Sequence, residues 1–556
     1  MPASSTPAAP SAPGFSVPSS SALSREAVLD VAAILPEWLE TLRASTLQTG
    51  LQAAIWYEGE LVAEVAVGPA DEPAGIPLRT THRLRIASHS KMMTALAILR
   101  LTEQSLLRLD DTLGERVPDL AGTPVADRTL RDLLSHSAGL TRDSADSRWW
   151  RLGIPFADRA QLLEIARTGA VTAEPGVHLQ YSNIGYGLLG LVIEEVTGAS
   201  FAEAVTELVL DPVGVAGLGP DLPADAPGPE AADGFAAGHT SLLHGPRRVV
   251  EQIPTGALAA ATGFWASAGA IATFAGRVLT EDALLSPASL REMRRRVWTL
   301  GEGRHYGLGL QMGQLHDFWA VGHSGGFPTG LSRTWAVPAQ RLAVSVIGTA
   351  VDAPTSAIAE GILGLLSLAA GRPAPQAGEW ERAGAQGGGS EGRERPVVLA
   401  DQPGVTVPGS VSAAGAGTPP GSGTGTEAGT TLTAQDLADL VSGTYDSLWG
   451  RTRLAVLGGR LFSLDESATD PAASALELSV GSEDGAVRTD PIDPALAAVE
   501  LATWGDPGYG SWSEPLLARL AFDAAEGALR CTGLVDTGQV QTPSAEFTMP
   551  ERVTAP

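Results

Sequence analysis

One serine and one lysine stand three residues apart at the start of a strongly helical stretch. Ser88 and Lys91 open a mostly apolar run that extends to about residue 104, so in a helix both side chains face the same way. A serine hydroxyl is a poor nucleophile until a neighbouring base removes its proton, and the helix N-terminus favours the alkoxide that results. Lys91 could be that base if its surroundings lowered its pKa from about 10.4. The pair indicates nucleophilic acyl transfer.

Lys91 is the single lysine among 37 basic residues, of which 36 are arginine. Codon bias in a GC-rich genome explains why lysine is scarce, since Ala, Gly, Pro and Arg are all heavily used. It does not explain why one lysine remains, because arginine replaces most surface lysines at little cost. Arginine cannot replace a lysine that must lose its proton, since a guanidinium stays charged. We therefore expect Lys91 to be a catalytic amine.

A second candidate group is the tripeptide Tyr181-Ser182-Asn183, which precedes another helical pattern. A tyrosine near a lysine ammonium can titrate well below about 10 and act as a base. The amide of Asn183 could hold both the lysine and a substrate carbonyl. Taken alone, the motif more often marks a core tyrosine whose hydroxyl is satisfied.

The segment 322–326, Gly-His-Ser-Gly-Gly, has two competing interpretations. It matches G-x-S-x-G, the nucleophile elbow, but an elbow needs a helix directly after the turn. A second strand-like run follows instead, so we reject the elbow. The other interpretation is an edge strand that lines a pocket. Its glycines would let the backbone approach substrate, and the Gly326 N–H would point at an oxyanion.

The three motifs, in this order, resemble the serine β-lactamase and penicillin-binding-protein superfamily. The nearest branch is the class C-like group of esterases, D-aminopeptidases and related peptidases. Supporting stretches are residues 133–140, 181–190, 263–267 and 306–309, and the resemblance covers about residues 24–370. Some members carry a lipocalin-like β-barrel after a linker, and residues 433–556 look like one.

The resemblance implies a mechanism and a set of site residues. Ser88 would form an acyl-enzyme that water cleaves, Lys91 and Tyr181 would share the base work, and Tyr181 would protonate the leaving group. The N–H groups of Ser88 and Gly326 would form the oxyanion hole. Four residues would bind substrate: Asn183, His323, Ser324 and Gly325. No cofactor or metal is implied.

One position departs from the family pattern. Most β-lactamases and DD-peptidases have Lys-Thr/Ser-Gly where this chain has His-Ser-Gly at 323–325. A permanent cation that grips a substrate carboxylate has become an imidazole that is mostly neutral near pH 7. Penicillins and peptides with free C-termini should therefore bind less well. Arg333 could replace the lost cation, but we expect it to be a solvent-facing strand residue.

Other residues that could do chemistry have simpler explanations. We expect His136 to be structural, because it lies in a turn at a helix end. His89 adjoins Ser88, but its helical phase points away from the face shared by Ser88 and Lys91. Trp149 and Trp150 could line an acyl pocket or anchor a loop, and the sequence does not separate the two.

The elements that must position these residues indicate an α/β (α+β) fold with an antiparallel sheet flanked by helices and a helical subdomain. Helical patterns begin at the N-cap candidate Ser24 and cover about residues 88–104, 129–134, 185–196 and 358–370. A hairpin is expected over 51–56 and 61–67, with further strands near 319–321, 331–337 and 341–348.

Composition divides the chain into four parts. We expect a tail over residues 1–22, a hydrolase domain over 23–370, a Gly/Pro/Ser-rich flexible linker over 371–431 and a small all-β barrel over 432–556. The strands expected in the last part begin at residues 443, 452, 460, 476, 517 and 529.

Charge and targeting signals limit the partners. The formal charge of 37 − 63 = −26 argues against nucleic-acid and membrane partners. Cys531 is the one cysteine, so an intramolecular disulfide is excluded. Residues 1–21 lack the features of a secretory signal and no apolar run reaches the roughly 18 residues of a membrane span. We expect a cytoplasmic protein, with a homo-oligomer left open.

The sequence thus predicts a cofactor-independent serine hydrolase that cleaves small esters or amides, either an esterase or a D-aminopeptidase-like peptidase. One alternative is a β-lactamase or DD-peptidase. An alternative of another class is a catalytically inactive scaffold used for binding, against which the presence of all three catalytic side chains weighs.

Overall fold

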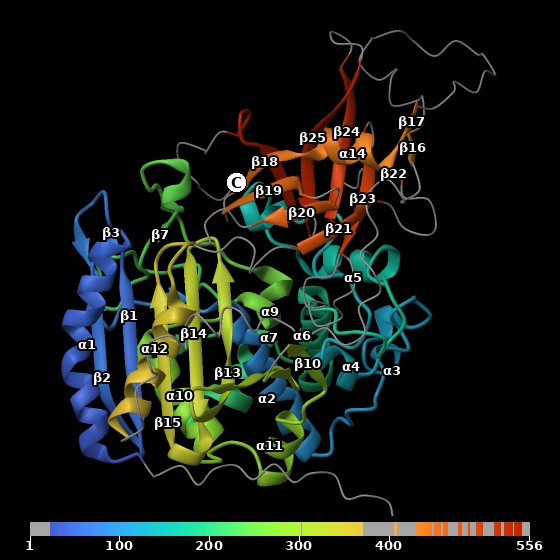
Figure 1. Ribbon diagram of the computed structural model, residues 1–556. Helices are drawn as coiled ribbons and strands as arrows, with labels where there is room; N and C mark the ends of the chain where they lie inside the picture. The colour runs from blue at the N-terminus through green and yellow to red at the C-terminus, as the bar shows by residue number, and fades with distance from the viewer. Residues whose placement is uncertain are drawn as a thin grey trace, which may run out of the picture.

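An eight-stranded antiparallel sheet is the centre of the N-terminal part of the protein in the computed structural model (Figure 1). The strand order is β10-β11-β12-β13-β14-β15-β1-β2. The bounds are β1 (Leu51–Tyr57), β2 (Glu60–Val67), β10 (Trp298–Gly301), β11 (Arg304–Tyr306), β12 (Gln311–Leu315), β13 (Phe318–Phe327), β14 (Gly330–Val337) and β15 (Leu342–Gly348). Because β15 pairs with β1, strands from both ends of this domain lie side by side. The expected antiparallel sheet and hairpin are confirmed.

The structure describes residues 23–301, 303–370, 405–407, 430–447, 450–457, 460–464, 476–480, 487–489, 496–503, 516–523, 528–536 and 539–547. The expected tail over 1–22 and nearly all of the expected linker over 371–431 lie outside these residues.

Two helices cover one face of the sheet. They are α1 (Arg25–Ser45) and α12 (Thr355–Ala369), the first and last helices of the domain, which lie together at the left of Figure 1. Leu35 and Ile362 pack there against Trp335 and Val344 of the sheet, all fully buried. The Ser24 hydroxyl accepts a hydrogen bond from the Ala27 N–H at 3.2 Å, so the expected N-cap is confirmed.

The other face carries α10 (Ala268–Thr280), which packs on β1, β14 and β15. Behind it, α2 (Ser90–Glu103) packs against α6 (Asn183–Thr197) and α9 (Ala259–Thr262). These helices share the largest hydrophobic core of the described residues, with Leu96, Ile193 and Phe274 fully buried. The two layers hold the N-terminus of α2 close to β13.

A helical subdomain extends from this layer, at the right of Figure 1. Its helices include α3 (Leu113–Arg116), α4 (Leu130–Leu134), α5 (Arg159–Thr168), α7 (Phe201–Val205) and α8 (Asp211–Val213), and α11 (Pro287–Met293) follows α10. The Thr129 hydroxyl caps α4 by accepting from the Asp132 N–H, and Gly198 ends α6 in the left-handed region. The helices expected at 129–134 and 185–196 are confirmed.

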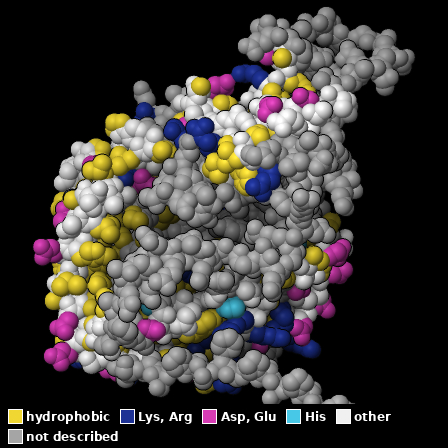
Figure 2. Space-filling model, in the orientation of Figure 1, with side chains coloured by type: hydrophobic (Ala, Val, Ile, Leu, Met, Phe, Trp, Pro, Cys, Tyr) yellow, Lys and Arg dark blue, Asp and Glu magenta, His cyan; other side chains and the backbone are white. Residues whose placement is uncertain are grey.

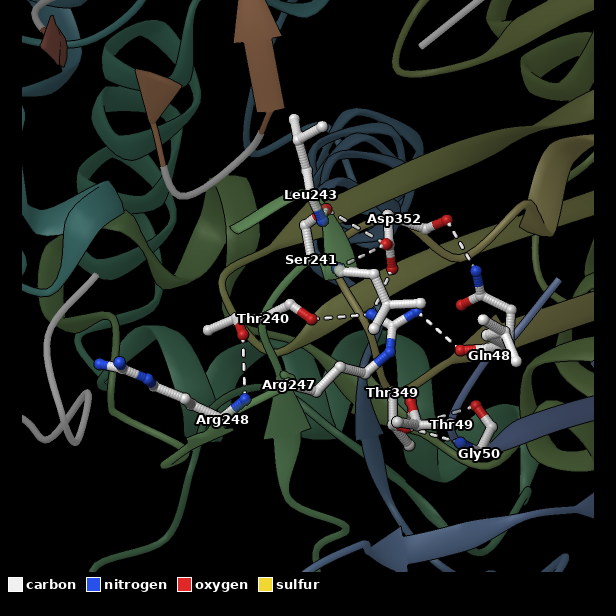
Figure 3. Close-up of polar contacts among 12 residues, drawn as sticks. Gln48, Thr49, Gly50, Thr240, Ser241, Leu243, Arg247, Arg248, Thr349 and Asp352 are labelled. Atoms are coloured by element: carbon white, nitrogen blue, oxygen red, sulfur yellow. Dashed lines mark hydrogen bonds and ion pairs between the residues drawn. The ribbon is translucent and has the colours of Figure 1, made fainter. Parts of the chain in front are cut away.

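A partly buried ion pair joins a surface loop to the sheet (Figure 3). The Arg247 guanidinium donates to Asp352 Oδ1 at 2.6 Å, to the Thr240 carbonyl at 2.7 Å and to the Leu47 carbonyl at 3.0 Å. Gln48 donates to the Asp352 carbonyl at 3.3 Å. These bonds join the loop around residues 240–248 to the α1–β1 and β15–α12 connections.

The C-terminal part is a curled antiparallel sheet with its own core. Strand order is β21-β20-β19-β18-β26-β25-β24-β23-β22, and β21 also pairs with β23. The bounds are β18 (Gly443–Ser447), β19 (Gly450–Leu457), β20 (Arg460–Leu464), β21 (Leu476–Val480), β22 (Val487–Thr489), β23 (Ala497–Thr503), β24 (Leu516–Asp523), β25 (Ala528–Asp536) and β26 (Gln539–Pro543), with α14 (Ala434–Val441). The pairing of β21 with β23 curls the sheet round on itself. The expected small all-β unit is confirmed.

Acidic side chains are scattered over the face of the molecule that Figure 2 shows. On the face in Figure 2, acidic side chains lie along both edges of the molecule and do not gather in one patch. In the described part of the chain, no helix is long and apolar enough to cross a membrane.

Candidate active site

Ser88 lies in a short 3-10 turn, Ala87–His89, that leads directly into α2. The residue before it, Ala87, has φ of +46°, in the left-handed region where an alanine is strained. Ser90 holds this turn: its hydroxyl donates to the Ala87 carbonyl at 2.5 Å and accepts from the Phe264 N–H at 2.9 Å. The turn places Ser88 at the surface of a cavity.

Lys91 is fully buried one helical turn further on. Its Nζ lies 3.2 Å from Ser88 Oγ, 2.7 Å from Asn183 Oδ1 and 3.0 Å from the Ala261 carbonyl oxygen. The amide and carbonyl oxygens can only accept hydrogen bonds. A neutral amine would donate its two N–H groups to them, which leaves its lone pair directed at Ser88 Oγ.

A buried carboxylate fixes the orientation of Asn183. The Asn183 amide donates to Asp143 Oδ1 at 3.0 Å, and because a carboxylate accepts this bond, the amide oxygen must face Lys91. Asp143 is fully buried, and burial raises the pKa of its carboxyl. The sequence analysis did not find Asp143, since no spacing relates Arg142-Asp143 to the three motifs.

Burial controls the ionisation of Lys91. Desolvation lowers the pKa of its amine well below the usual lysine value, while the Asp143 carboxylate partly opposes this shift and Arg142 adds to it. A buried lysine loses its proton more readily because the interior disfavours its charged form. The lowered pKa is the condition that the sequence analysis set for Lys91 to act as a base.

Tyr181 lies just before α6, and its ring is close to Lys91. The lysine Nζ is 4.6 Å from the ring centroid. Burial raises the pKa of the Tyr181 hydroxyl, and a hydrogen bond with Ser88 only partly offsets that effect. The direction is opposite to the lowered pKa expected from sequence, and it favours the neutral phenol form of Tyr181.

The 322–326 segment is part of β13 and is followed by β14, with no helix after it. The rejection of the nucleophile elbow is therefore confirmed. Ser324 and Gly326 line the cavity with Ser88, Tyr181 and Asn183. His323 and Gly325 are not among the described residues that line this cavity.

Gly325 serves a close approach of two backbone segments. A Cβ at this position would overlap the Ile86 carbonyl oxygen and lie 2.5 Å from Ser332 Oγ. Ile86 is two residues before Ser88, so the glycine lets the Ser88 turn pack directly on β13. The sequence analysis had assigned such glycines to the approach of substrate.

His323 lies behind the cavity surface in an aromatic cluster. Its Nδ1 donates to the Ser324 carbonyl at 2.6 Å, so its Nε2 accepts from the Tyr306 hydroxyl at 3.2 Å. Burial, with His89 nearby, lowers the pKa of His323 well below its usual value. Burial thus favours the neutral form of the imidazole.

His136 also belongs to this cluster. Its ring centroid is 4.2 Å from that of Tyr181 and 5.0 Å from that of Tyr306, and its Nδ1 accepts from the Ser182 N–H at 3.0 Å. His136 thus packs against the ring of Tyr181.

Trp149 and Trp150 are both buried in their short helix, and Trp150 lines the cavity.

The cavity has a volume of about 610 Å³. Its charged lining is basic, with the three arginines Arg142, Arg304 and Arg333. Arg333 was expected to face solvent, but this is wrong: it is only 7% exposed, donates to Gln311 Oε1 and stacks on Trp335 at 4.0 Å. Burial lowers the pKa of its guanidinium to about 10, so it remains charged at pH 7.

Comparison with known proteins identifies the family of the N-terminal part of the chain. The Beta-lactamase family profile matches residues 37–369, which is more than half of the chain. The chain belongs to the beta-lactamase family. It is 33% identical over 183 residues to the esterase EstB of Burkholderia gladioli, a match that covers 31% of this chain and 46% of the esterase. The match therefore spans less than half of that relative.

Two solved structures have the same fold as this beta-lactamase-family chain. The octameric penicillin-binding protein homologue from Pyrococcus abyssi has a TM-score of 0.54 at 19% identity, covering 92% of this chain and 99% of that one. The D-amino acid amidase from Ochrobactrum anthropi SV3 has a TM-score of 0.51 at 21% identity, covering 61% of this chain and 97% of that one. The first match extends over both parts of the chain.

In the described part of the chain, no group of His, Cys, Asp or Glu side chains could hold a metal ion.

Proposed function

We propose that the protein is a serine hydrolase that cleaves small esters or amides through an acyl-enzyme on Ser88. The observation that carries the proposal is the position of Lys91, whose Nζ lies 3.2 Å from Ser88 Oγ in a fully buried environment. A nucleophile at the surface of a cavity, with a buried base beside it, is the arrangement that acyl transfer needs. The esterase and amidase among its relatives support the substrate class.

In the proposed reaction, Ser88 Oγ forms a bond to the acyl carbon while its proton moves to Lys91 Nζ. The carbonyl oxygen takes the negative charge, and the N–H groups of Ser88 and Gly326 are the proposed donors to it. The bond to the leaving group then breaks, and the leaving group takes a proton from Tyr181, which regains one from Lys91. Water next attacks the ester carbonyl, and the proton it loses returns to Ser88 Oγ as the acid leaves.

We assign the base to Lys91 and the acid to Tyr181. Burial favours the neutral form of both groups, which means an unprotonated amine and a protonated phenol. The two groups are close enough to titrate together, so the assignment describes the resting state.

The first experiment is labelling with a fluorophosphonate probe. Wild-type protein should be labelled, Ser88→Ala protein should not, and Ser324→Ala protein should still be labelled at Ser88. Hydrolysis of p-nitrophenyl esters and of D- and L-aminoacyl anilides then separates an esterase from a peptidase. Folded wild-type protein that is neither labelled nor active would support the inactive-scaffold alternative.

A second candidate, a β-lactamase or DD-peptidase, is favoured by Arg333. It has no ion-pair partner among the described residues and lies in the cavity beside Ser324, its neighbour across β13 and β14. It could therefore bind the carboxylate for which His323 is unsuited. Arg333→Gln should lower kcat/KM for nitrocefin relative to p-nitrophenyl acetate by about tenfold or more, since a charge-assisted bond contributes about 1.5–3 kcal/mol. An unchanged ratio would remove this candidate.

A further inference from the structure

The cavity that holds Ser88 has a wall from the C-terminal β domain. Ser447, the last residue of β18, and Gln541, in β26, line it together with Ser88 and Trp150. Figure 1 shows this domain stacked on one end of the N-terminal domain. In sequence, Ser447 lies 78 residues and Gln541 172 residues after the end of α12 at Ala369, but both line the same cavity as Ser88.

Ser447 and Gln541 form one patch because their strands are paired. The antiparallel register of β18 and β26 sets Tyr445 opposite Pro543 and Asp446 opposite Thr542. Continued by one residue, this register brings Ser447 opposite Gln541. Two polar side chains from neighbouring strands therefore face the cavity together.

The patch formed by Ser447 and Gln541 is joined to the N-terminal domain by a hydrogen bond close to the cavity that Ser88 lines. Arg151 ends the short helix that carries Trp150, and its guanidinium donates to the carbonyl of Val540, next to Gln541. Burial lowers the pKa of this guanidinium, because the bond lies inside the contact between the domains. One short helix thus contributes Trp150 to the cavity and Arg151 to the domain contact.

The end of strand β18, which carries Ser447, is held within its own domain. Asp446 is buried and accepts two bonds from the Arg451 guanidinium, at 2.7 and 3.0 Å. A bidentate pair of this kind restricts the geometry of both side chains. The end of β18 therefore has a fixed position beside the cavity.

Gln541 has an unused acceptor. Its Oε1 is buried and has no hydrogen-bond partner among the described residues. A buried carbonyl oxygen without a donor is costly, so such groups usually have a partner. Since Gln541 lines the cavity, a bound molecule with an N–H group can supply that donor.

We propose that the C-terminal domain is part of the substrate site, and that Gln541, with Ser447 beside it, binds an amide N–H of the substrate remote from the bond that Ser88 attacks. This inference rests on the proposed function and narrows its substrate class to acyl compounds that carry an amide, such as short peptides. A plain alkanoate ester has no donor to offer Gln541 Oε1.

The test uses two series of p-nitrophenyl esters on the full-length protein. One series carries N-acetylglycine, N-acetyl-diglycine or N-acetyl-triglycine, and the other carries straight alkanoates of the same lengths. The series of lengths allows for the unknown reach from Ser88 to Gln541. At the acyl length that spans the distance from Ser88 to Gln541, kcat/KM for the amide-bearing ester should exceed that of the alkanoate by about tenfold.

Gln541→Met keeps the side-chain length and removes the acceptor, so the ratio of kcat/KM for the amide-bearing ester to that for the alkanoate should fall toward one. Gln435→Met is the matched control, because Gln435 is in the same domain but binds Asp439 on α14. It should keep the wild-type preference. An equal preference in wild type and Gln541→Met protein, at every length, would overturn the proposal.

A binding measurement separates this inference from the proposed function. Ser88→Ala protein is titrated by calorimetry with N-acetyl-diglycine amide, alone and with Gln541→Met added. The second substitution should weaken binding about tenfold even if the wild type proves to hydrolyse nothing. Equal affinities would overturn the inference, whereas failure of Ser88 labelling would overturn only the proposed function. Circular dichroism confirms that each variant is folded.

Discussion

At the scale of single residues, Lys91 shows why one lysine remains in a chain whose other basic residues are arginines. Its Nζ has two acceptors, Asn183 Oδ1 and the Ala261 carbonyl, and one partner that must lose a proton, Ser88. A guanidinium has five donors and no lone pair to offer Ser88. The surroundings of this side chain therefore suit an amine and not an arginine.

Lys91→Arg should lower kcat/KM for p-nitrophenyl esters by at least about 10²-fold, the usual scale for the loss of a general base. An arginine supplies the positive charge of a protonated lysine but cannot accept a proton, so the loss measures proton acceptance. Steady-state hydrolysis of p-nitrophenyl esters by folded variant and wild-type protein makes the comparison. Activity within a few-fold of wild type would show that Lys91 supplies only charge.

The pH dependence of the reaction follows from the direction of the Lys91 shift. A base must be unprotonated, so kcat/KM should rise with pH through the pKa of Lys91 and level off above it. Because burial lowers that pKa, the inflection should lie well below about 10.4, the ordinary lysine value. A profile of kcat/KM in the free enzyme measures it. A rise that begins only near pH 10 would contradict the assignment of Lys91 as the base.

The residues found from sequence and those missed differ in a physical way. Ser88 and Lys91 are three apart on one helix, so their proximity follows from local geometry. Asp143 reaches Asn183 only because the helical subdomain folds residues 40 apart together. The sequence analysis expected Arg333 to face solvent. The alternation of side chains along a strand shows which residues share a face, but it cannot show that a cavity continues past the edge of β13.

At the scale of elements, the contact between β13 and the Ser88 turn depends on Gly325. Gly325→Ala would push the added methyl group into the Ile86 carbonyl oxygen, which is backbone and cannot rotate away. We expect a loss of about 1–3 kcal/mol in stability, as for other overpacked sites, and slower fluorophosphonate labelling of Ser88.

The control for this change is Gly361→Ala in α12, where the nearest atom is the Trp38 ring at 3.1 Å. Alanine is a better helix former than glycine, so stability should hold or rise and labelling should be unchanged. Labelling at the wild-type rate in Gly325→Ala would show that the turn does not depend on this contact.

The Arg247–Asp352 pair in Figure 3 supports the sheet from another side. The Arg247 side chain is 2% exposed and that of Asp352 is 28% exposed. Asp352→Asn leaves the arginine charge buried, which should cost about 2–3 kcal/mol, somewhat less than for a fully buried pair. Glu281→Gln, which breaks the Arg341–Glu281 pair, should cost much less, because the Arg341 side chain is half exposed. Urea unfolding of both variants gives the comparison, and equal losses would contradict it.

The elements that the sequence predicted share a strong local pattern. The hairpin of β1 and β2, the long helices α1 and α2, and strands β14 and β15 all carry runs of apolar residues with clear ends. Strands β10, β11 and β12 were missed because they are short and carry polar residues such as Gln311 and Arg304. No local signal shows that β15 lies beside β1, since some 285 residues separate their pairing ends, from Tyr57 to Leu342.

At the scale of the whole molecule, the described residues form separate hydrophobic cores in two domains. The sheet of the N-terminal domain is packed on both faces, and the C-terminal domain has a core of its own around Leu461 and Leu520. The change in composition after residue 370 predicted two folded units. The cavity lined by both units could not be predicted, because it depends on how their surfaces meet.

Separate cores should unfold separately. We expect calorimetry of the full chain to show two transitions, since each core can melt without exposing the other. Leu461→Ala removes a fully buried side chain from the C-terminal core and should destabilise that unit by about 2–5 kcal/mol. It should lower one transition and leave the other near its wild-type temperature. Leu363→Ala, in the core between α12 and the sheet, should lower the other transition instead. If each substitution lowered both transitions equally, the two domains would unfold as one cooperative unit through their shared contact.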